Sequence, residues 1–511
     1  MLPWTCARAV SRRAEPSLLR GLHQVLHGSR STASKPLQFA AHRVQLLSKT
    51  PPNIKSIFRQ QHRPLSAIFA SSPRSPFDSR YFSSNSAQAL APEASSESAA
   101  EEAPEPQPVL TPPAVAYWLL CTSGLVFAVT VVGAITRLTE SGLSITEWRP
   151  ITGILPPLSA AQWEEEFRKY QATPEFKLIN HSIDIHQFKS IFYMEWGHRV
   201  LGRLIGISFV LPLVYFATRR RVLSRQLVQR LGLLGLLIGF QGALGWYMVK
   251  SGLEESLMET PGAVPRVSQY RLAAHLGAAF LLYAGMFGTG LNILYDWRYA
   301  QGAGWSGMKT EVAGTEWKKV LENPLVKRFS RYSKALTALV FVTALSGAFV
   351  AGLDAGLLYN EFPLMGGRLM PPSSELFSSS YAKKADGSDY WWRNIFENPA
   401  TVQFNHRCLA MTTYASTTAL WLLSKTPAMK AALPPMVQRF AMSAFAMVNV
   451  QLALGISTLL YLVPVSLAAA HQAGSVMLFT TVIHLLVSLR RPGAAARAYR
   501  AATAKAKGLQ R

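Results

Sequence analysis

Four histidines form two matched pairs, one pair in each half of the chain. His198 and His406 each precede an arginine, and His275 and His471 each follow a pair of alanines. Imidazole is a common axial ligand of haem iron, and facing helices of a four-helix bundle can hold one cofactor between them. We therefore predict two haem sites, each held by one pair of histidines.

Other interpretations of these histidines are weaker. A zinc site needs more than two ligands, and neither half adds an obvious further ligand to its two histidines. A proton path suits a single histidine in a membrane helix but does not need matched pairs. Three further histidines, His181, His186 and His484, have no counterpart in the other half, and we expect surface or structural roles for them.

An arginine follows the first histidine of each pair. A haem carries two propionate groups, and arginine can bind a carboxylate with two hydrogen bonds. Arg199 and Arg407 are therefore candidates for binding propionates, and Arg137 and Arg203 are further candidates. An ordinary anchor at the membrane interface is an equally good interpretation of each arginine taken alone.

The two halves differ at one position that bears on chemistry. Glu195 precedes His198 by three residues, so both lie on one helix face, whereas Gln403 stands at the equivalent place before His406. A carboxyl group near the membrane can shift its pKa and exchange protons, which an amide cannot do. This asymmetry predicts that the first half does chemistry and the second half holds a cofactor. A carboxylate paired with Arg199 or Arg203 is the alternative.

The sequence between and before the histidines repeats as well. Segment 241–245 (QGALG) matches 451–455 (QLALG), and the stretch 133–148 matches 347–362. A membrane span needs about 20 apolar residues, and eight segments qualify: 114–135, 200–217, 228–249, 272–294, 334–353, 404–423, 440–463 and 469–487. We predict an all-α membrane protein with eight transmembrane helices, arranged as two parallel-repeat four-helix bundles.

The amino-terminal region resembles a targeting segment followed by a linker. Residues 1–85 hold 13 Lys and Arg but only Glu15 and Asp78 as acidic residues, as in an organelle transit peptide. Residues 86–113 are acidic and rich in Ala, Ser and Pro, which predicts a disordered linker. A mitochondrial address is expected, and a chloroplast address stays open. The three cysteines, Cys6, Cys121 and Cys408, form no disulfide framework.

The basic residues predict the orientation of the helices. The formal net charge is +24, but the charge is concentrated in residues 1–85 and in loops beside the spans, so we expect no nucleic-acid partner. With eight spans, the basic regions 219–230, 318–331, 425–439 and 490–507 all lie on one side. In a mitochondrion that side is the matrix, which would hold both termini. All four paired histidines would then lie toward the intermembrane space.

Residues 114–490 resemble the haem A synthase family in its mitochondrial form. The resemblance is carried by 136–144 (TRLTESGLS), 148–150 (WRP), 195–199 (EWGHR) and the three later histidines. It implies oxidation of the methyl group at ring position eight of haem O to a formyl group, which gives haem A for cytochrome c oxidase. It also implies that His198 and His275 ligate haem O, that His406 and His471 ligate haem b, and that Glu195 is the catalytic residue.

The resemblance also implies the domain organisation and the partners. A transit peptide (1–85) and linker (86–113) precede a substrate haem bundle (114–297), a matrix loop (298–333), a haem b bundle (334–490) and a basic matrix tail (491–511). A ferredoxin and its reductase would supply electrons at the mitochondrial inner membrane, and a homo-oligomer is left open. Many bacterial members carry a cysteine pair in the loop after the first helix, which this chain lacks. The alternatives are a di-haem b-type electron carrier without haem modification and a transporter that uses histidines as proton sites.

Overall fold

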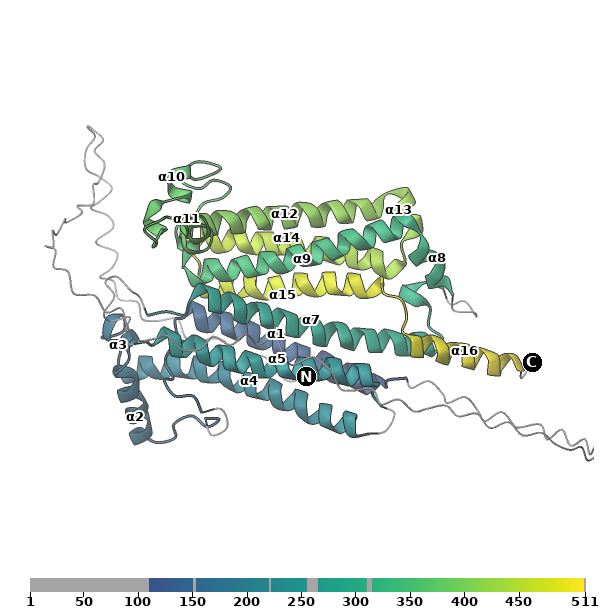
Figure 1. The fold of residues 1–511 in the computed structure, drawn as a ribbon, viewed down its shortest axis with the longest axis horizontal. Coiled ribbons are helices and arrows are strands. Elements are labelled where there is room, and N and C mark those ends of the chain that lie inside the picture. Colours follow the sequence, from purple (N-terminus) through teal and green to yellow (C-terminus); the bar gives the residue numbers. More distant parts are fainter. Residues whose placement is uncertain (1–109, 150–152, 220–221, 255–264, 310–314, 510–511) are drawn as a thin grey trace, which may run out of the picture. The chain divides into compact units, whose positions relative to one another are not determined.

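The computed structural model describes residues 110–149, 153–219, 222–254, 265–309 and 315–509. Within these ranges the chain is helical apart from its loops, and the one isolated bridge joins Met365 to Arg368. The predicted all-α class is therefore confirmed for the described residues. The predicted transit peptide and all but the last residues of the predicted linker lie outside them. The long helices are α1 (Pro113–Leu138), α4 (Ile185–Thr218), α5 (Arg225–Gly252), α7 (Gln269–Ala300), α9 (Pro324–Gly352), α12 (Pro399–Lys425), α14 (Pro435–Leu460), α15 (Val465–Ser488) and α16 (Ala494–Leu509) (Figure 1).

Seven helices in the described ranges are long and apolar enough to cross a membrane: α1, α4, α5, α7, α9, α14 and α15. The eighth predicted span, 404–423, falls on α12, which has 27 residues but is not among the seven. The reason is composition, since α12 carries a polar first third and several threonines. It nevertheless lies beside α9 and α14 along its length (Figure 1).

Several helices begin earlier than the apolar stretch within them. Helix α4 begins at Ile185, whereas the apolar segment predicted a start near residue 200. The side chain of Asp184 accepts from the backbone N–H of Gln187, and the Gln187 side chain accepts from the backbone N–H of Asp184. This capping box starts the helix in a polar sequence. As a result His198 lies more than three turns inside α4 rather than at its start.

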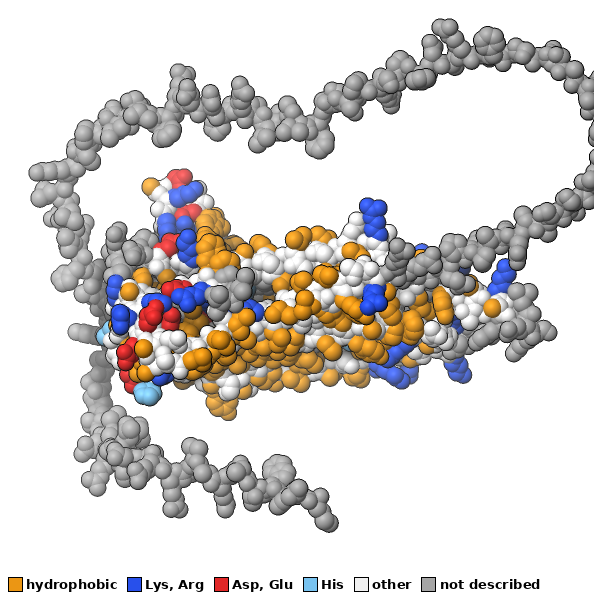
Figure 2. All heavy atoms as spheres, turned by 90° about the horizontal axis from the view of Figure 1, so that it is seen from below, with side chains coloured by type: hydrophobic (Ala, Val, Ile, Leu, Met, Phe, Trp, Pro, Cys, Tyr) orange, Lys and Arg blue, Asp and Glu red, His pale blue; other side chains and the backbone are white. Residues whose placement is uncertain are grey.

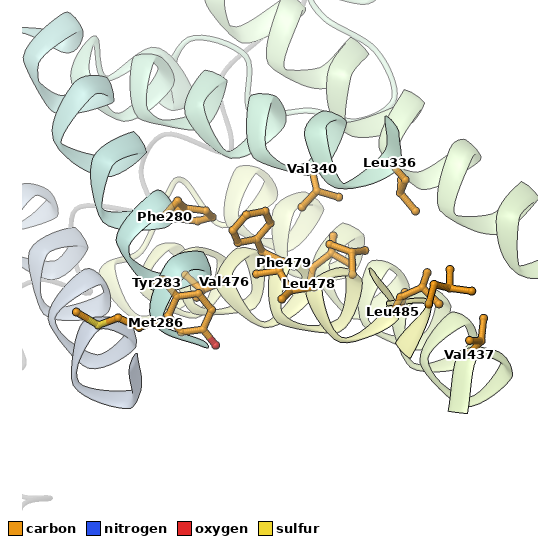
Figure 3. Packing of buried hydrophobic residues seen from close by; sticks show 14 of the residues in the cluster. Phe280, Tyr283, Met286, Leu336, Val340, Val437, Val476, Leu478, Phe479 and Leu485 are labelled. Carbon is orange, nitrogen blue, oxygen red and sulfur yellow. The ribbon is translucent and has the colours of Figure 1, made fainter. Parts of the chain in front are cut away.

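The core lies where α1, α7 and α15 meet their neighbours. In the apolar middle of α7, half of the residues are buried, whereas only 6% are buried in the apolar middle of α5. Phe280 of α7 packs on Phe479 of α15 with ring centroids 5.3 Å apart. The hydroxyls of Tyr283 and Thr480 form a hydrogen bond of 2.7 Å. Figure 3 shows these aromatic side chains meeting between the helices. The two halves of the chain therefore share one apolar core.

The outward-facing helix surfaces are apolar instead of charged. Leu211 of α4 is 65% exposed and Leu236 of α5 is 72% exposed, although burial of such side chains is favourable in water. Figure 2 shows apolar side chains along the middle of the face in view, with Lys and Arg near the ends. This distribution is expected of helices that face lipid.

Short helices gather at the two ends of the long ones. At one end lie α2 (Ala160–Gln171), α3 (Pro174–Leu178), α10 (Ser373–Leu376) and α11 (Tyr390–Glu397) (Figure 1). At the other end lie α8 (Glu316–Glu322), α13 (Pro427–Ala432) and α16. The aromatic side chains of Trp163, Tyr170, Phe188 and Phe192 form a cluster that fixes α2 and α3 on the first turns of α4.

Candidate functional site

All four paired histidines line one cavity of about 1640 Å³, which extends between residues of both halves. Pockets for one small ligand usually measure about 300–1,000 Å³, so this cavity has room for two. His198 of α4 and His275 of α7 lie on helices that both pack on α1, and His406 of α12 and His471 of α15 lie on helices that both pack on α9. The structure therefore brings the histidines together in the pairs that the sequence predicted.

Each of these histidine rings lies against a glycine of a neighbouring helix. A Cβ atom on Gly133 of α1 would lie 2.8 Å from Cε1 of His198, and one on Gly347 of α9 would lie 3.2 Å from Cε1 of His406. The same distance is 3.5 Å between Gly245 and His275, and 2.9 Å between Gly455 and His471. Three of these four positions are too tight for an ordinary Cβ contact, so glycine is what lets the ring occupy its place.

A glutamine holds the backbone of the second histidine in each half. Gln241 Nε2 donates to the carbonyl oxygen of His275 at 3.0 Å, and Gln451 Nε2 donates to that of His471 at 3.0 Å. These contacts explain why the segments 241–245 and 451–455 match. The glutamine binds the histidine's backbone, and the glycine four residues later lies against its ring.

The histidine rings differ in their own hydrogen bonds. Nδ1 of His406 lies 2.7 Å from the hydroxyl of Ser346, which itself donates to the carbonyl oxygen of Thr343 at 2.7 Å. The hydroxyl therefore accepts from Nδ1, and Nε2 is left without a hydrogen, in the form that binds iron. The equivalent residue beside Gly133 is Val132, which has no hydroxyl to offer His198. Nδ1 of His198, of His275 and of His471 meets no well-oriented hydrogen-bond partner in the described part.

Glu195 lines the same cavity and is 3% exposed. Its Oε1 accepts from Nε and Nη2 of Arg199 at 3.0 and 2.7 Å. Its Oε2 accepts from the Ser144 hydroxyl and from the backbone N–H of Ile145, both at 2.8 Å. Three residues thus place four hydrogen-bond donors around this side chain. The ion pair with Arg199, which the sequence left as an alternative, is present.

Arg199 and Arg407 each bind the loop that precedes their helix. Arg199 also donates to the carbonyl oxygens of Ile145 and Glu147 at 2.9 and 3.0 Å. Arg407 donates to those of Tyr359 and Leu364, each at 2.9 Å. The Nε atom of Arg407 is buried and finds no partner among the described residues. Arg407 therefore keeps a donor for an anion, whereas most donors of Arg199 are engaged.

Gln403 takes the place of Glu195 in the second half. Its Nε2 donates to the carbonyl oxygen of Tyr359 at 3.0 Å, whereas Glu195 accepts from the N–H of Ile145, the equivalent loop residue. Both side chains thus fix the loop after the first helix of their half, one with a charge and one without.

Arg137 and Arg203 also line the cavity. Arg137 Nη2 donates to Asp354 Oδ1 at 2.9 Å, and Asp354 Oδ2 pairs with Arg266 at 3.1 Å. Arg203 donates to the carbonyl oxygen of Arg149 at 2.9 Å. The Arg137–Asp354 pair joins the end of α1 to the end of α9, so it also fastens the two halves together.

The three unpaired histidines stay outside the cavity. His181 and His186 are exposed in the segment around the start of α4. His484 of α15 stacks on Phe440 with centroids 4.4 Å apart and meets Phe287 at 5.0 Å. These surroundings agree with surface roles for the first two and a packing role for the third.

Sequence reasoning missed a buried carboxyl group of the cavity wall. Glu175, the second residue of α3, lines the cavity and is only 4% exposed. A glutamate in the first turn of a short helix, after a threonine cap and a proline, is usually exposed and stabilised by the helix dipole. No local pattern indicated that α3 would be buried, with Phe176 packed on Phe167 and Tyr170 of α2.

The comparisons with known proteins agree with this arrangement. A family model described as cytochrome oxidase assembly protein (COX15-CtaA) matches residues 116–483. The chain is 47% identical over 382 residues to heme A synthase COX15 of Saccharomyces cerevisiae, which covers 74% of this chain and 76% of the yeast protein. It is 44% identical over 377 residues to heme A synthase COX15 of Homo sapiens, which covers 74% and 83%.

A further relative carries an additional function in its name. The heme A synthase–mitochondrial ferredoxin fusion protein of Schizosaccharomyces pombe is 47% identical over 375 residues, which are 73% of this chain and 59% of that protein. The family predicted from the sequence is confirmed, because the family model covers most of the chain and the relatives match over most of their length. The chain belongs to the COX15-CtaA family of cytochrome oxidase assembly proteins.

Proposed function

We propose that this chain is a haem A synthase, an oxidoreductase that converts the methyl group at ring position eight of haem O to a formyl group. The observation that carries the proposal is the cavity that both histidine pairs line together with the buried carboxyl group of Glu195. The compared relatives are named as haem A synthases, which favours this enzyme over a di-haem electron carrier or a transporter.

The residues present fit haem groups. A porphyrin supplies four nitrogen ligands to its iron, so two histidines complete the coordination. The buried ring nitrogens, the glycine cradles and the cavity volume all support this fit. Bound haem would supply the redox chemistry, and the protein would position the reacting methyl group and exclude water.

The two sites differ in ways that support separate roles. His198 and His275 would hold haem O beside Glu195, which we assign as the catalytic residue. His406 and His471 would hold haem b, where Gln403 replaces the carboxylate. The Ser346 hydroxyl on His406 supports the second assignment, because a fixed ring suits a cofactor that stays bound. We keep Arg199 and Arg407 as propionate-binding residues, and the unpartnered Nε of Arg407 supports this role for it.

We further propose that α12 is the eighth membrane span, and that the chain folds as two parallel-repeat four-helix bundles. The position of α12 beside α9 and α14 and the matching glycine–histidine contacts of the two halves support this topology. The protein would lie in the mitochondrial inner membrane with both termini in the matrix. The basic segments next to α4, α8, α13 and α16 support this orientation.

A ferredoxin with its reductase is the proposed electron source. The fusion of a haem A synthase with a mitochondrial ferredoxin in one relative supports it, because fusion raises the effective concentration of two partners. Haem O is the proposed substrate, and a homo-oligomer stays a prediction.

Haem analysis of the purified full-length chain tests the proposed function. Absorption spectra should show a Soret band with the signals of low-spin haem, and extracted pigments should include haem b, haem O and haem A by mass. Cells that make haem O should form haem A only when this chain is present. A colourless protein would contradict both haem sites, and two permanent b-type haems without haem A would support the electron carrier instead.

Replacing Gly133 by alanine should weaken the haem O site without harm to the helix. The new Cβ would lie 2.8 Å from Cε1 of His198, and overpacking of this kind costs about 1–3 kcal/mol. Retention of haem O should therefore fall about tenfold, measured as pigment bound per protein. Gly245→Ala is the matched control, because its Cβ would meet His275 at an ordinary 3.5 Å. Equal retention in the two variants would contradict the glycine cradle.

A further inference from the structure

A second carboxyl group of the cavity has no place in the function proposed so far. Glu175 lies in α3, in the segment that connects α1 to α4, and lines the cavity together with Glu195 and His198. Its side chain is almost fully buried, and Oε2 is enclosed without any hydrogen-bond partner within the described residues. A buried polar atom without a partner is costly, so this arrangement needs an explanation.

The surroundings of Glu175 are suited to a protonated carboxyl group. Tyr170 of α2, which acts on Glu175, is fully buried, carries no charge and accepts a hydrogen bond from Asn180 at 2.9 Å. No lysine or arginine in the described ranges forms an ion pair with Glu175, whereas Lys169 of α2 is paired with Glu147, Glu165 and Glu166.

The nearby charges are negative. Burial, the charge of Glu195 on α4 and, to a smaller extent, the charge of Glu140 after α1 raise the pKa of Glu175 to about 8, although Tyr170 acts in the opposite direction. At neutral pH the group is therefore mostly a neutral acid, because it is protonated below its pKa. Glu195 accepts hydrogen bonds from four donors. Glu175 is buried and lies near the charge of Glu195.

A buried neutral acid next to a second carboxyl group is a common arrangement of a general acid. With dioxygen as the oxidant and the ferredoxin as the electron donor, the oxidation is RCH₃ + 2 O₂ + 4 H⁺ + 4 e⁻ → RCHO + 3 H₂O, so protons must reach a site closed by protein. A neutral acid can give one of these protons to an oxygen that leaves as water, as COOH becomes COO⁻, and it regains a proton from bulk water before the next turnover.

We propose that Glu175 is the proton-exchanging carboxyl group of the haem O half of the cavity and gives a proton to the site. The inference rests on the proposed function, since it assigns a role within haem O oxidation. It divides the tasks between the two carboxyl groups. Glu195 fixes the loop and the local charge, and Glu175 carries the proton.

The test compares full-length variants in membranes supplied with haem O and a ferredoxin reduced by its reductase. Glu175→Gln keeps the size of the side chain but cannot release a proton, so haem A formation per bound haem should fall at least about tenfold at neutral pH. Wild-type activity should decline as the pH rises through about 8, because the acid form is lost. That decline should be absent in Glu175→Gln, and Glu175→Asp should restore part of the activity.

Glu316→Gln is the matched control. Glu316 is 3% exposed, has an Oε2 atom without a partner in the described part, and lies in α8 at the opposite end of the long helices (Figure 1). It should leave the rate and the pH profile of haem A formation unchanged. The Soret absorbance per protein should match the wild type in all the variants, which shows that the sites are loaded.

Two results would overturn the inference. One is a wild-type rate and pH profile in Glu175→Gln. The other is an equal loss of bound haem in Glu175→Gln and Glu175→Asp, which would mean that Glu175 only supports the fold. Failure of the proposed function would look different, since the wild-type chain itself would then form no haem A.

Discussion

Replacing His198 by alanine is expected to stop haem A formation and to leave haem O unconverted. The His198 imidazole lies against Gly133 and lines the cavity together with His275, and the first half contributes no third described imidazole to the cavity. Because even changes around a metal ligand commonly cost about 10–100-fold, loss of the ligand should lower haem A formation at least about a hundredfold. Extracted pigments identified by mass would measure haem A and haem O directly.

Two further variants give this experiment its specificity. His406→Ala should remove the haem b signal from the spectrum while haem O still binds, because the two sites use different histidines. His186→Ala changes an exposed histidine of the same helix α4 and should behave as the wild type. Normal haem A in His198→Ala would contradict the assignment of the substrate site.

The paired histidines could be predicted because the chain repeats itself. Each motif was visible twice, and a feature that recurs at equivalent places is rarely accidental. The structure adds the reason for the flanking residues. Gln241 and Gln451 bind the histidine backbones, and the glycines beside them make room for the rings.

The hydrophobic pattern did not predict the full length of helices that include polar stretches. The hydrophobic pattern predicted the part of α4 within the membrane, but Asp184 and Gln187 begin the helix earlier. The capping pattern was readable in the sequence as an acidic residue followed three residues later by glutamine. In helix α12 the threonines and the polar first turns lower the mean hydropathy. The helix nevertheless packs on α9 and α14 as the other long helices pack on their neighbours.

Contacts made by the loops at the helix ends could not be predicted. Glu175 is buried in α3, where its neighbour Phe176 packs on Tyr170 of α2, and Asp354 pairs with Arg137 across the two halves. These contacts depend on how loops fold over helix ends, where spacing along the chain carries no signal. Such positions are found from the packed structure, and they include the group to which we assign proton exchange.

Replacing Glu195 by glutamine is expected to abolish oxidation while haem O still binds. The amide keeps an oxygen for the Ser144 hydroxyl and the Ile145 N–H, but it removes the charge and turns donors toward Arg199. Proton-transfer and charge contributions of one residue are commonly worth about 10²–10⁴-fold, so haem A per bound haem should fall at least about a hundredfold. Pigment analysis and the Soret absorbance would be measured on the same sample.

Arg199→Gln separates the charge of Glu195 from its ion pair. Both variants lose the contacts at 2.7 and 3.0 Å between the two side chains, but only Arg199→Gln leaves the carboxylate in place. We expect Arg199→Gln to bind haem O less tightly and still to convert what it binds. If instead both variants convert bound haem O equally poorly, the ion pair as a support for the loop would explain Glu195, and its assignment as the catalytic residue would be wrong.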